Sequence, residues 1–175
     1  MRTRKHLPEL INEIDFLFET KDRFRSSVDS LYTIHTSRYL NFYSNLFGDD
    51  EFCSYIACLF LDMARNGVEW GNRNNPRKYL RVTNYVGQRA IIVSVEDQGD
   101  GFDYDAHFRL LRKGRNFTSR GRDGKKWRGG RGLRWLYEDK NILVNLEGQG
   151  NRIFALYEYP ENLKVNPKAR LVTEP

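Results

Sequence analysis

The sequence has few cysteines, few histidines and no long apolar run. Its two cysteines, Cys53 and Cys58, fit neither a C-x-x-C redox motif nor a zinc site, so we expect buried thiols in a reducing cytoplasm. Three scattered histidines disfavour a multi-histidine metal site. The longest strictly apolar run, Tyr55 to Leu61, is far shorter than the roughly 20 residues of a membrane helix. The first ten residues, MRTRKHLPEL, lack the apolar stretch of a secretory signal. These absences predict a cytoplasmic protein without a membrane span.

The length and composition predict one domain with a hydrophobic core. The chain has 175 residues, a length that suits one domain better than two. Of these residues 39% are hydrophobic and 14% aromatic, which is enough to fill one core. We expect a leader over residues 1–12, a single domain over 13–159 and a C-terminal tail over 160–175.

The positive charge is concentrated in one segment. Residues 109–134 contain eleven Lys or Arg and a single acid, Asp123, whereas the formal net charge of the whole chain is only +6. A uniformly basic surface would indicate nucleic acid, which this distribution does not favour. The segment is typical of a solvated flexible loop, and two alternatives remain: a loop that faces phosphate, or a dock for an acidic protein.

The first half of the chain predicts one strand followed by two helices. Residues 1–10 are expected to be loose, and 13–19 to form an edge strand. Apolar positions recur with an approximate 3.6-residue period over 28–47 and again over 51–70, which predicts two amphipathic helices. The intervening Gly48-Asp49-Asp50 should end the first helix and cap the second.

The second half predicts two hairpins separated by a glycine-rich, basic loop. The β-rich runs of the hairpins turn at Gly87 and at Gly148-Gln149-Gly150-Asn151. Between the hairpins we expect short helices over 104–112 and 133–138 and a mobile loop over 113–128. This order predicts a two-layer α/β sandwich, with a mixed, mostly antiparallel sheet and helices on one face.

Two groups of residues could carry polar chemistry. Asp62 and Asn66 are four residues apart on a predicted helix and therefore share one face. A carboxylate beside an amide oxygen suits Mg²⁺ and its waters, although such pairs are common on helix surfaces.

The second group lies after a predicted strand, where Asp97 precedes Gly99 and Gly101. An aspartate there can accept a hydrogen bond from an exocyclic amine while the glycines let the backbone approach a flat ligand, and an ordinary Asp/Gly turn is the alternative.

A third group is the glycine pair Gly130 and Gly132, which opens a predicted helix. Glycines before a helix N-terminus leave backbone N–H groups free for phosphate. The spacing is not that of a Walker A loop, and a flexible Arg/Gly loop is the alternative.

The three groups, in this order, resemble the N, G1 and G2 boxes of the GHKL ATPase superfamily (DNA gyrase, the Hsp90 chaperones, histidine kinases and MutL). The resemblance covers roughly residues 13–159 and implies a Bergerat-type ATP-binding fold. The helix Asp62…Asn66…Gly71-Asn72 is most similar to the E-x-x-x-N-A-x-x-H-G-N helix of stand-alone anti-sigma factor serine/threonine kinases.

The resemblance also implies roles for single residues. Asn66 would hold Mg²⁺ bridging the ATP phosphates, and Asp97 would bind the adenine amino group. Asp62 stands at the position of the catalytic Glu that activates a substrate serine hydroxyl, and it is one methylene shorter. The remaining contacts implied by the resemblance come from glycines of the base pocket and of the lid hinge: Gly99, Gly101, Gly130 and Gly132. Phosphate ligands among the basic residues between the second and third groups, Lys126 and Arg131 included, are a separate hypothesis.

The implied activity is ATP-dependent phosphorylation of a serine on a regulatory protein, with a sigma factor and an anti-anti-sigma protein as the expected partners. Homodimerisation is a further expectation from the family. Because Asp62 is shorter than Glu, an ATP-binding regulatory switch with little kinase activity is the alternative. A nucleic-acid binder is the third reading, and it predicts binding that falls steeply with salt and needs no ATP.

Overall fold

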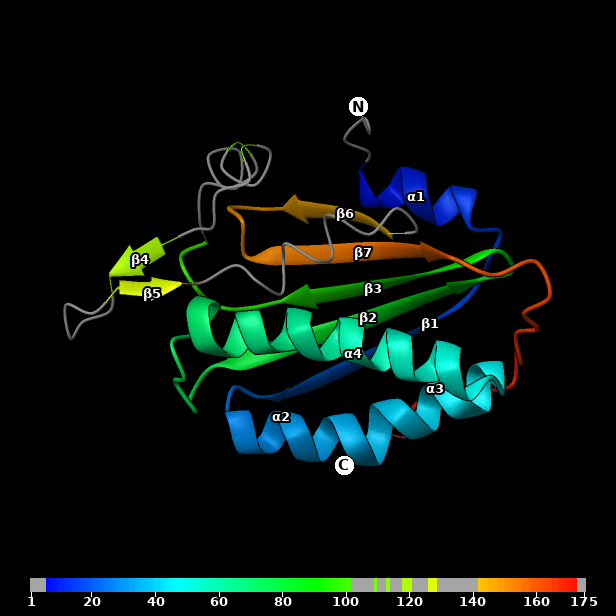
Figure 1. Cartoon of the computed structure of the whole chain (residues 1–175), viewed down its shortest axis with the longest axis horizontal. Helices are drawn as coiled ribbons and strands as arrows, with labels where there is room; N and C mark the ends of the chain where they lie inside the picture. Colours follow the sequence, from blue (N-terminus) through cyan, green and yellow to red (C-terminus); the bar gives the residue numbers. More distant parts are fainter. Residues whose placement is uncertain are drawn as a thin grey trace.

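The protein is a mixed α/β structure built on a five-stranded antiparallel sheet. The computed structural model describes residues 6–101, 109, 113, 118–120, 126–128 and 142–172, with the backbone alone for 118–120 and 126–128. The strand order is β1-β2-β3-β7-β6, so β1 is an edge strand as expected (Figure 1). The strands are β1 (Phe16–Arg25), β2 (Tyr79–Gly87), β3 (Ala90–Glu96), β6 (Ile142–Glu147) and β7 (Arg152–Glu158). Both predicted hairpins are confirmed as β2–β3 and β6–β7.

The two predicted helices are confirmed, each with a π-helical segment. The first comprises α2 (Val28–Ile34), η1 (His35–Tyr39) and α3 (Leu40–Phe47). The second comprises α4 (Asp50–Asn66) and η2 (Gly67–Gly71).

Local capping explains where these helices begin and end. The Ser27 hydroxyl accepts a hydrogen bond from the Ser30 N–H at 3.1 Å, and the Asp49 carboxylate accepts one from the Phe52 N–H at 2.8 Å. Between the helices Gly48 adopts a left-handed conformation with φ of 66°, which a glycine tolerates at a helix C-terminus. The structure therefore confirms that Gly48-Asp49-Asp50 ends one helix and caps the next.

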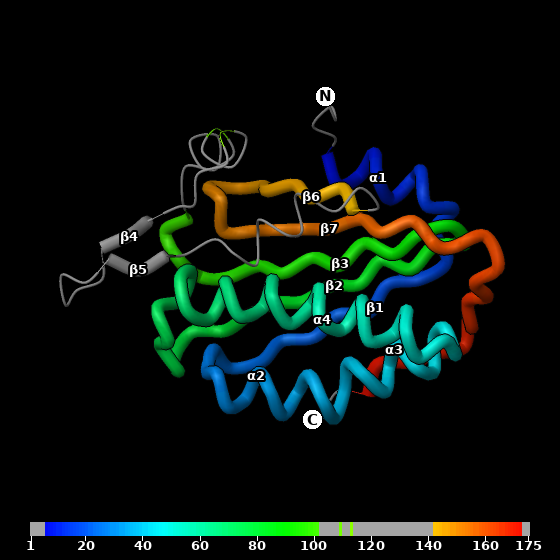
Figure 2. Tube along the Cα trace, viewed as in Figure 1, coloured from blue at the N-terminus to red at the C-terminus, as the bar shows by residue number. Residues whose placement is uncertain are grey.

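The helices α2, α3 and α4 cover one face of the sheet, called here the helix-covered face (Figures 1 and 2). The Tyr39 and Phe60 rings stack there with centroids 3.8 Å apart, and the Tyr43 hydroxyl donates to the Asn84 amide oxygen of β2 at 2.8 Å. Of the two thiols expected in the core, Cys53 is buried but Cys58 is exposed, because it lies on the opposite side of α4.

The opposite face of the sheet, called the outer face, carries a helix that the sequence reasoning missed. α1 (Leu7–Glu13) packs Leu7 and Leu10 against a second apolar cluster that includes Ile92 and Phe154. The expectation of a loose segment over residues 1–10 is therefore wrong for residues 7–10, and so is that of helices on one face only. The chain then turns at Asp15, with φ of 51°, so the edge strand begins at Phe16 rather than Glu13.

The basic segment between the hairpins contains regular structure that was not expected. β4 (Thr118–Arg120) and β5 (Lys126–Arg128) pair as an antiparallel two-stranded sheet inside the stretch predicted to be a loop. The short helix expected over 133–138, and that over 104–112 apart from Arg109, lie outside the described residues.

The residues after the last strand pack against the helices. The Asn166 N–H donates to the Leu46 carbonyl at 2.8 Å, and Ala169 is buried in the main core. This stretch has no helix or strand over residues 160–172, yet it is part of the folded structure. Across the described residues, no helix combines the length and apolar character needed to cross a membrane.

Candidate functional site

The Asp97 carboxylate lies where the end of β3 meets the end of the α4 helix. Strand alternation turns Glu96 toward the outer face and places Asp97 against the helix-covered side. A Cβ atom built on Gly67 would lie 3.5 Å from the Asp97 Cβ, and one built on Gly71 would overlap the Asp97 carboxyl carbon. The structure therefore brings Gly67 and Gly71, which follow Asp62 and Asn66 along the chain, against the Asp97 loop, although they are about thirty residues apart in sequence.

Asp97 is a half-buried carboxylate with little compensation. One carboxylate oxygen accepts a hydrogen bond from the Gly99 N–H at 2.7 Å. Burial raises the Asp97 pKa to about 6, while the Gly99 hydrogen bond and the nearby Lys78 ammonium oppose the rise. Among the described residues the second carboxylate oxygen accepts no hydrogen bond. It is thus an acceptor for a donor that the described protein does not supply.

The backbone on both sides of this carboxylate consists of glycines, which carry no side chain that could collide with it. A Cβ on Gly71 would overlap the Asp97 carboxyl group, and one on Gly99 would overlap the Gly71 carbonyl. Gly101 has φ of 72° and sits so close to the Gln149 carbonyl that a side chain there would overlap it. Larger residues at these positions would displace the Asp97 loop.

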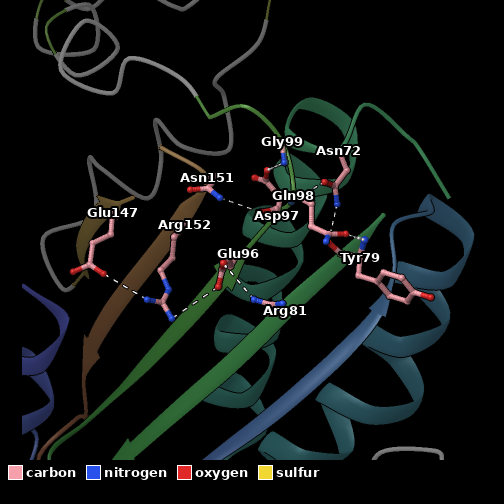
Figure 3. A network of polar contacts seen from close by, with 10 residues as sticks. All are labelled: Asn72, Tyr79, Arg81, Glu96, Asp97, Gln98, Gly99, Glu147, Asn151 and Arg152. Carbon is pink, nitrogen blue, oxygen red and sulfur yellow. Dashed lines mark hydrogen bonds and ion pairs between the residues drawn. The ribbon is translucent and has the colours of Figure 1, made fainter. Parts of the chain in front are cut away.

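Asn72 clamps the Asp97 loop to the sheet, a role that the sequence did not reveal (Figure 3). Its amide oxygen accepts from the Gln98 N–H at 2.8 Å, and its amide nitrogen donates to the Tyr79 carbonyl at 2.9 Å. The Asn72 side chain is buried, so both bonds are shielded from water. Asn72 was part of the motif that carried the resemblance, but only the fold gives it these partners.

A second clamp comes from the turn between β6 and β7. The Asp97 N–H donates to the Asn151 carbonyl at 2.9 Å, and the Asn151 side-chain amide donates to the Asp97 carbonyl at 3.2 Å (Figure 3). Asn151 carries no motif signal, because an asparagine in a Gly-rich turn is ordinary turn chemistry. The Asp97 backbone is therefore fixed from both neighbouring strands, which positions its carboxylate.

Asp62 and Asn66 lie one turn apart on α4, as predicted, and both are half-buried. Asn66 directly precedes Gly67, whose backbone packs toward Asp97. A hard cation bound through one or two protein oxygens and substrate phosphates would find suitable donor types in this pair. Within the described residues, no group of three or more His, Cys, Asp or Glu side chains could hold a metal ion by itself.

The third sequence motif cannot be placed. Gly130, Arg131 and Gly132 lie outside the described residues, and Lys126 is described only as backbone on β5. Their roles stay predictions.

No family model matches the chain, and no curated protein matches it in sequence.

Proposed function

We propose that the chain is an ATP-binding domain of the GHKL type that phosphorylates a serine on a regulatory protein, in the manner of the anti-sigma factor kinases. The observation that carries the proposal is the Asp97 site. The Asp97 carboxylate is positioned between two glycine backbones, and one of its oxygens accepts no hydrogen bond from the described residues. Such a group suits the amino edge of a flat base such as adenine. The arrangement of α2, α3 and α4 over one face of the antiparallel sheet is compatible with the Bergerat-type sandwich, which is part of the same proposal.

The α4 helix supplies the remaining residues of the proposed reaction. Mg²⁺·ATP would supply the phosphoryl group and neutralise part of its charge, with Asn66 as the protein ligand of the cation. Asp62, one helical turn earlier, would accept the proton of the substrate hydroxyl. Gly130, Gly132, Lys126 and Arg131 are proposed to contact the triphosphate.

A calorimetric titration with ATP, ADP and GTP, with and without Mg²⁺, tests nucleotide binding. We expect adenine nucleotides to bind and GTP to bind at least tenfold more weakly. Asp97→Asn should lose at least tenfold in ATP affinity, because an amide at this position carries no charge and places a donor group against the base. Exposed Asp100 provides the matched control, since Asp100→Asn alters the same loop but leaves the Asp97 carboxylate intact. Absence of binding at millimolar ATP, or equal binding by Asp97→Asn, would contradict the proposal.

The alternative is an ATP-binding switch with little phosphoryl transfer, and the observation that favours it is the short side chain of Asp62. Its side chain is one methylene shorter than Glu, and a displacement of about 1 Å can cost on the order of a hundredfold in rate. In a true kinase Asp62→Asn should abolish phosphoryl transfer while ATP still binds. In a switch, Asp62→Asn should leave partner binding and its dependence on ATP unchanged.

A further inference from the structure

A second polar site lies on the outer face of the sheet, away from Asp97. It is a hollow of about 610 Å³ above β1, β2, β3 and β7, called here the outer hollow. Cavities of this size are typical of small-molecule sites. The residues of its lining that carry the argument are Lys21, Arg23, Arg81, Thr83, Ser94 and Arg152.

The outer hollow carries an excess of positive charge. Four of its lining side chains are Lys or Arg, and two, Asp22 and Glu96, are acidic. The Asp22 carboxylate is engaged on the other side of the sheet, where Arg38 donates to it at 3.4 Å. Glu96 is therefore the acid that faces the four cations from within the lining, while just outside it Glu19 pairs with Lys21 and Glu147 lies near Arg152. The four cations still outnumber these three acids, so an anionic ligand would find a favourable potential.

Arg152 is held in place without having its donors used up. Its guanidinium lies 4.0 Å from the Glu96 carboxylate and 3.7 Å from that of Glu147, and Arg81 lies 3.7 Å from Glu96 (Figure 3). These separations are longer than hydrogen bonds. The Arg152 Nε is moreover buried and has no hydrogen-bond partner among the described residues. A buried N–H donor without a partner is costly, and a bound acceptor would remove that cost.

Hydroxyl groups stand beside these cations. Ser94 on β3 is 2% exposed, and Thr83 and Tyr85 line the hollow from β2. Guanidinium forks match the geometry of phosphate oxygens, and hydroxyls supply further donors.

We propose that the outer hollow binds a small phosphate monoester, with its phosphate on Arg152 and Arg81 and the hydroxyls around it. A monoester dianion carries two negative charges, and it would face four cations and the single Glu96 carboxylate. The organic part would lie against the Tyr85 ring and the Thr83 methyl group. The inference does not rest on the proposed nucleotide site, because Glu96 and Asp97 face opposite sides of the sheet.

Amide chemical shifts of the ¹⁵N-labelled full chain test this inference, since they report where a ligand binds. The probes are inorganic phosphate and glycerol 3-phosphate, with glycerol and succinate as uncharged and dicarboxylate controls. We expect saturable shifts of the Thr83, Ser94 and Arg152 amides with glycerol 3-phosphate, weaker ones with inorganic phosphate, and none with glycerol. Equal binding of succinate, or shifts confined to the Asp97–Gly101 loop, would overturn the proposal.

Three variants and a matched control complete the test. Arg152→Gln should weaken binding about tenfold, the effect of losing one charge-assisted contact. Lys21→Gln alters an exposed side chain, so it should weaken binding several-fold without disturbing the fold. Glu96→Gln should tighten binding several-fold, because it removes the competing carboxylate. Arg25→Gln is the control, because Arg25 lies on the same strand and face as Arg23 but outside the lining. The affinity of this variant for glycerol 3-phosphate should stay within twofold of the wild type. Equal losses in Arg25→Gln and Arg152→Gln would reduce the effect to general surface charge and overturn the site.

Discussion

Two aspartates on the helix-covered side of the sheet meet very different surroundings. Asp22 on β1 is buried, and both the Arg38 guanidinium at 3.4 Å and the Tyr39 hydroxyl at 3.5 Å contact its carboxylate. At the end of β3, the Asp97 carboxylate accepts one hydrogen bond from the described residues, that of the Gly99 N–H, and burial raises its pKa to about 6. Two side chains contact the Asp22 carboxylate, whereas the Asp97 carboxylate is only partly compensated, by the Gly99 N–H and the Lys78 charge.

The difference separates a carboxylate that serves the fold from one that is available to a ligand. An underpaired, partly buried charge costs stability at neutral pH, and such groups are concentrated at functional sites. The competing interpretation is that Asp97 only stabilises a tight turn through the Gly99 N–H. An asparagine would accept that hydrogen bond equally well, so the carboxylate charge itself is what a ligand site would explain.

The largest expected effect is a difference in unfolding free energy between substitutions at Asp22 and at Asp97. Asp22→Ala should lower the free energy of unfolding by about 3 kcal/mol, because it leaves Arg38 and Tyr39 facing an unfilled buried position. Asp97→Asn should stay within about 1 kcal/mol of the wild type, on the stabilising side, because it removes an underpaired charge. Urea unfolding at pH 7 measures both. A loss for Asp97→Asn as large as that for Asp22→Ala would remove the distinction between them.

A loss of similar size is expected when the clamp on the Asp97 loop is cut. Asn72→Ala leaves the Gln98 N–H and the Tyr79 carbonyl without their partner, which should cost about 3 kcal/mol of unfolding free energy. Exposed Asn75 in the same loop is the matched control, and Asn75→Ala should cost under about 1 kcal/mol. Denaturant unfolding gives both values, and equal losses would contradict the clamp.

A smaller effect is expected where glycine leaves room for the Asp97 carboxylate. Gly71→Ala should cost about 2 kcal/mol, because the new methyl group overlaps the carboxyl group. It should also weaken ATP binding at least tenfold under the proposed function. In a double-mutant cycle, adding Asp97→Ala should recover part of the lost stability, since the clash is then relieved. Strictly additive losses would show that the two residues do not interact.

The smallest effect is a pH dependence of stability. The Asp97 pKa is raised to about 6 in the folded state, against about 3.9 for an unperturbed aspartate. The folded state therefore holds a proton between these values that the unfolded state has lost, so this group favours unfolding increasingly as pH rises from about 4 to 6. The stability advantage of Asp97→Asn should accordingly be present at pH 7 and vanish near pH 4.

Thermal unfolding from pH 4 to pH 7.5 measures this dependence. Asp100→Asn alters an exposed carboxylate in the same loop, and its difference from the wild type should stay nearly constant with pH. Under the proposed function, adenosine affinity should fall as pH drops below about 6, because the neutral carboxyl group is a weaker acceptor. A pH-independent difference between Asp97→Asn and the wild type would contradict the raised pKa.

The sequence by itself determined the elements with strong local signals. The apolar periodicity and the caps at Ser27, Gly48 and Asp49 specify the two long helices, and alternation with glycine turns specifies the two hairpins. The sequence also placed Asp62 and Asn66 on one helix face, because helical spacing is a local property.

Other features depended on contacts between distant segments. The short helix α1 is stabilised by apolar side chains of the outer face rather than by a strong signal of its own, so propensity did not reveal it. The partners of Asn72, the second clamp from Asn151 and the bare acceptor of Asp97 exist only once three strand ends meet. The outer hollow likewise draws its charge from four strands. Burial and electrostatic compensation depend on which segments come together in space, and the tertiary structure alone decided them.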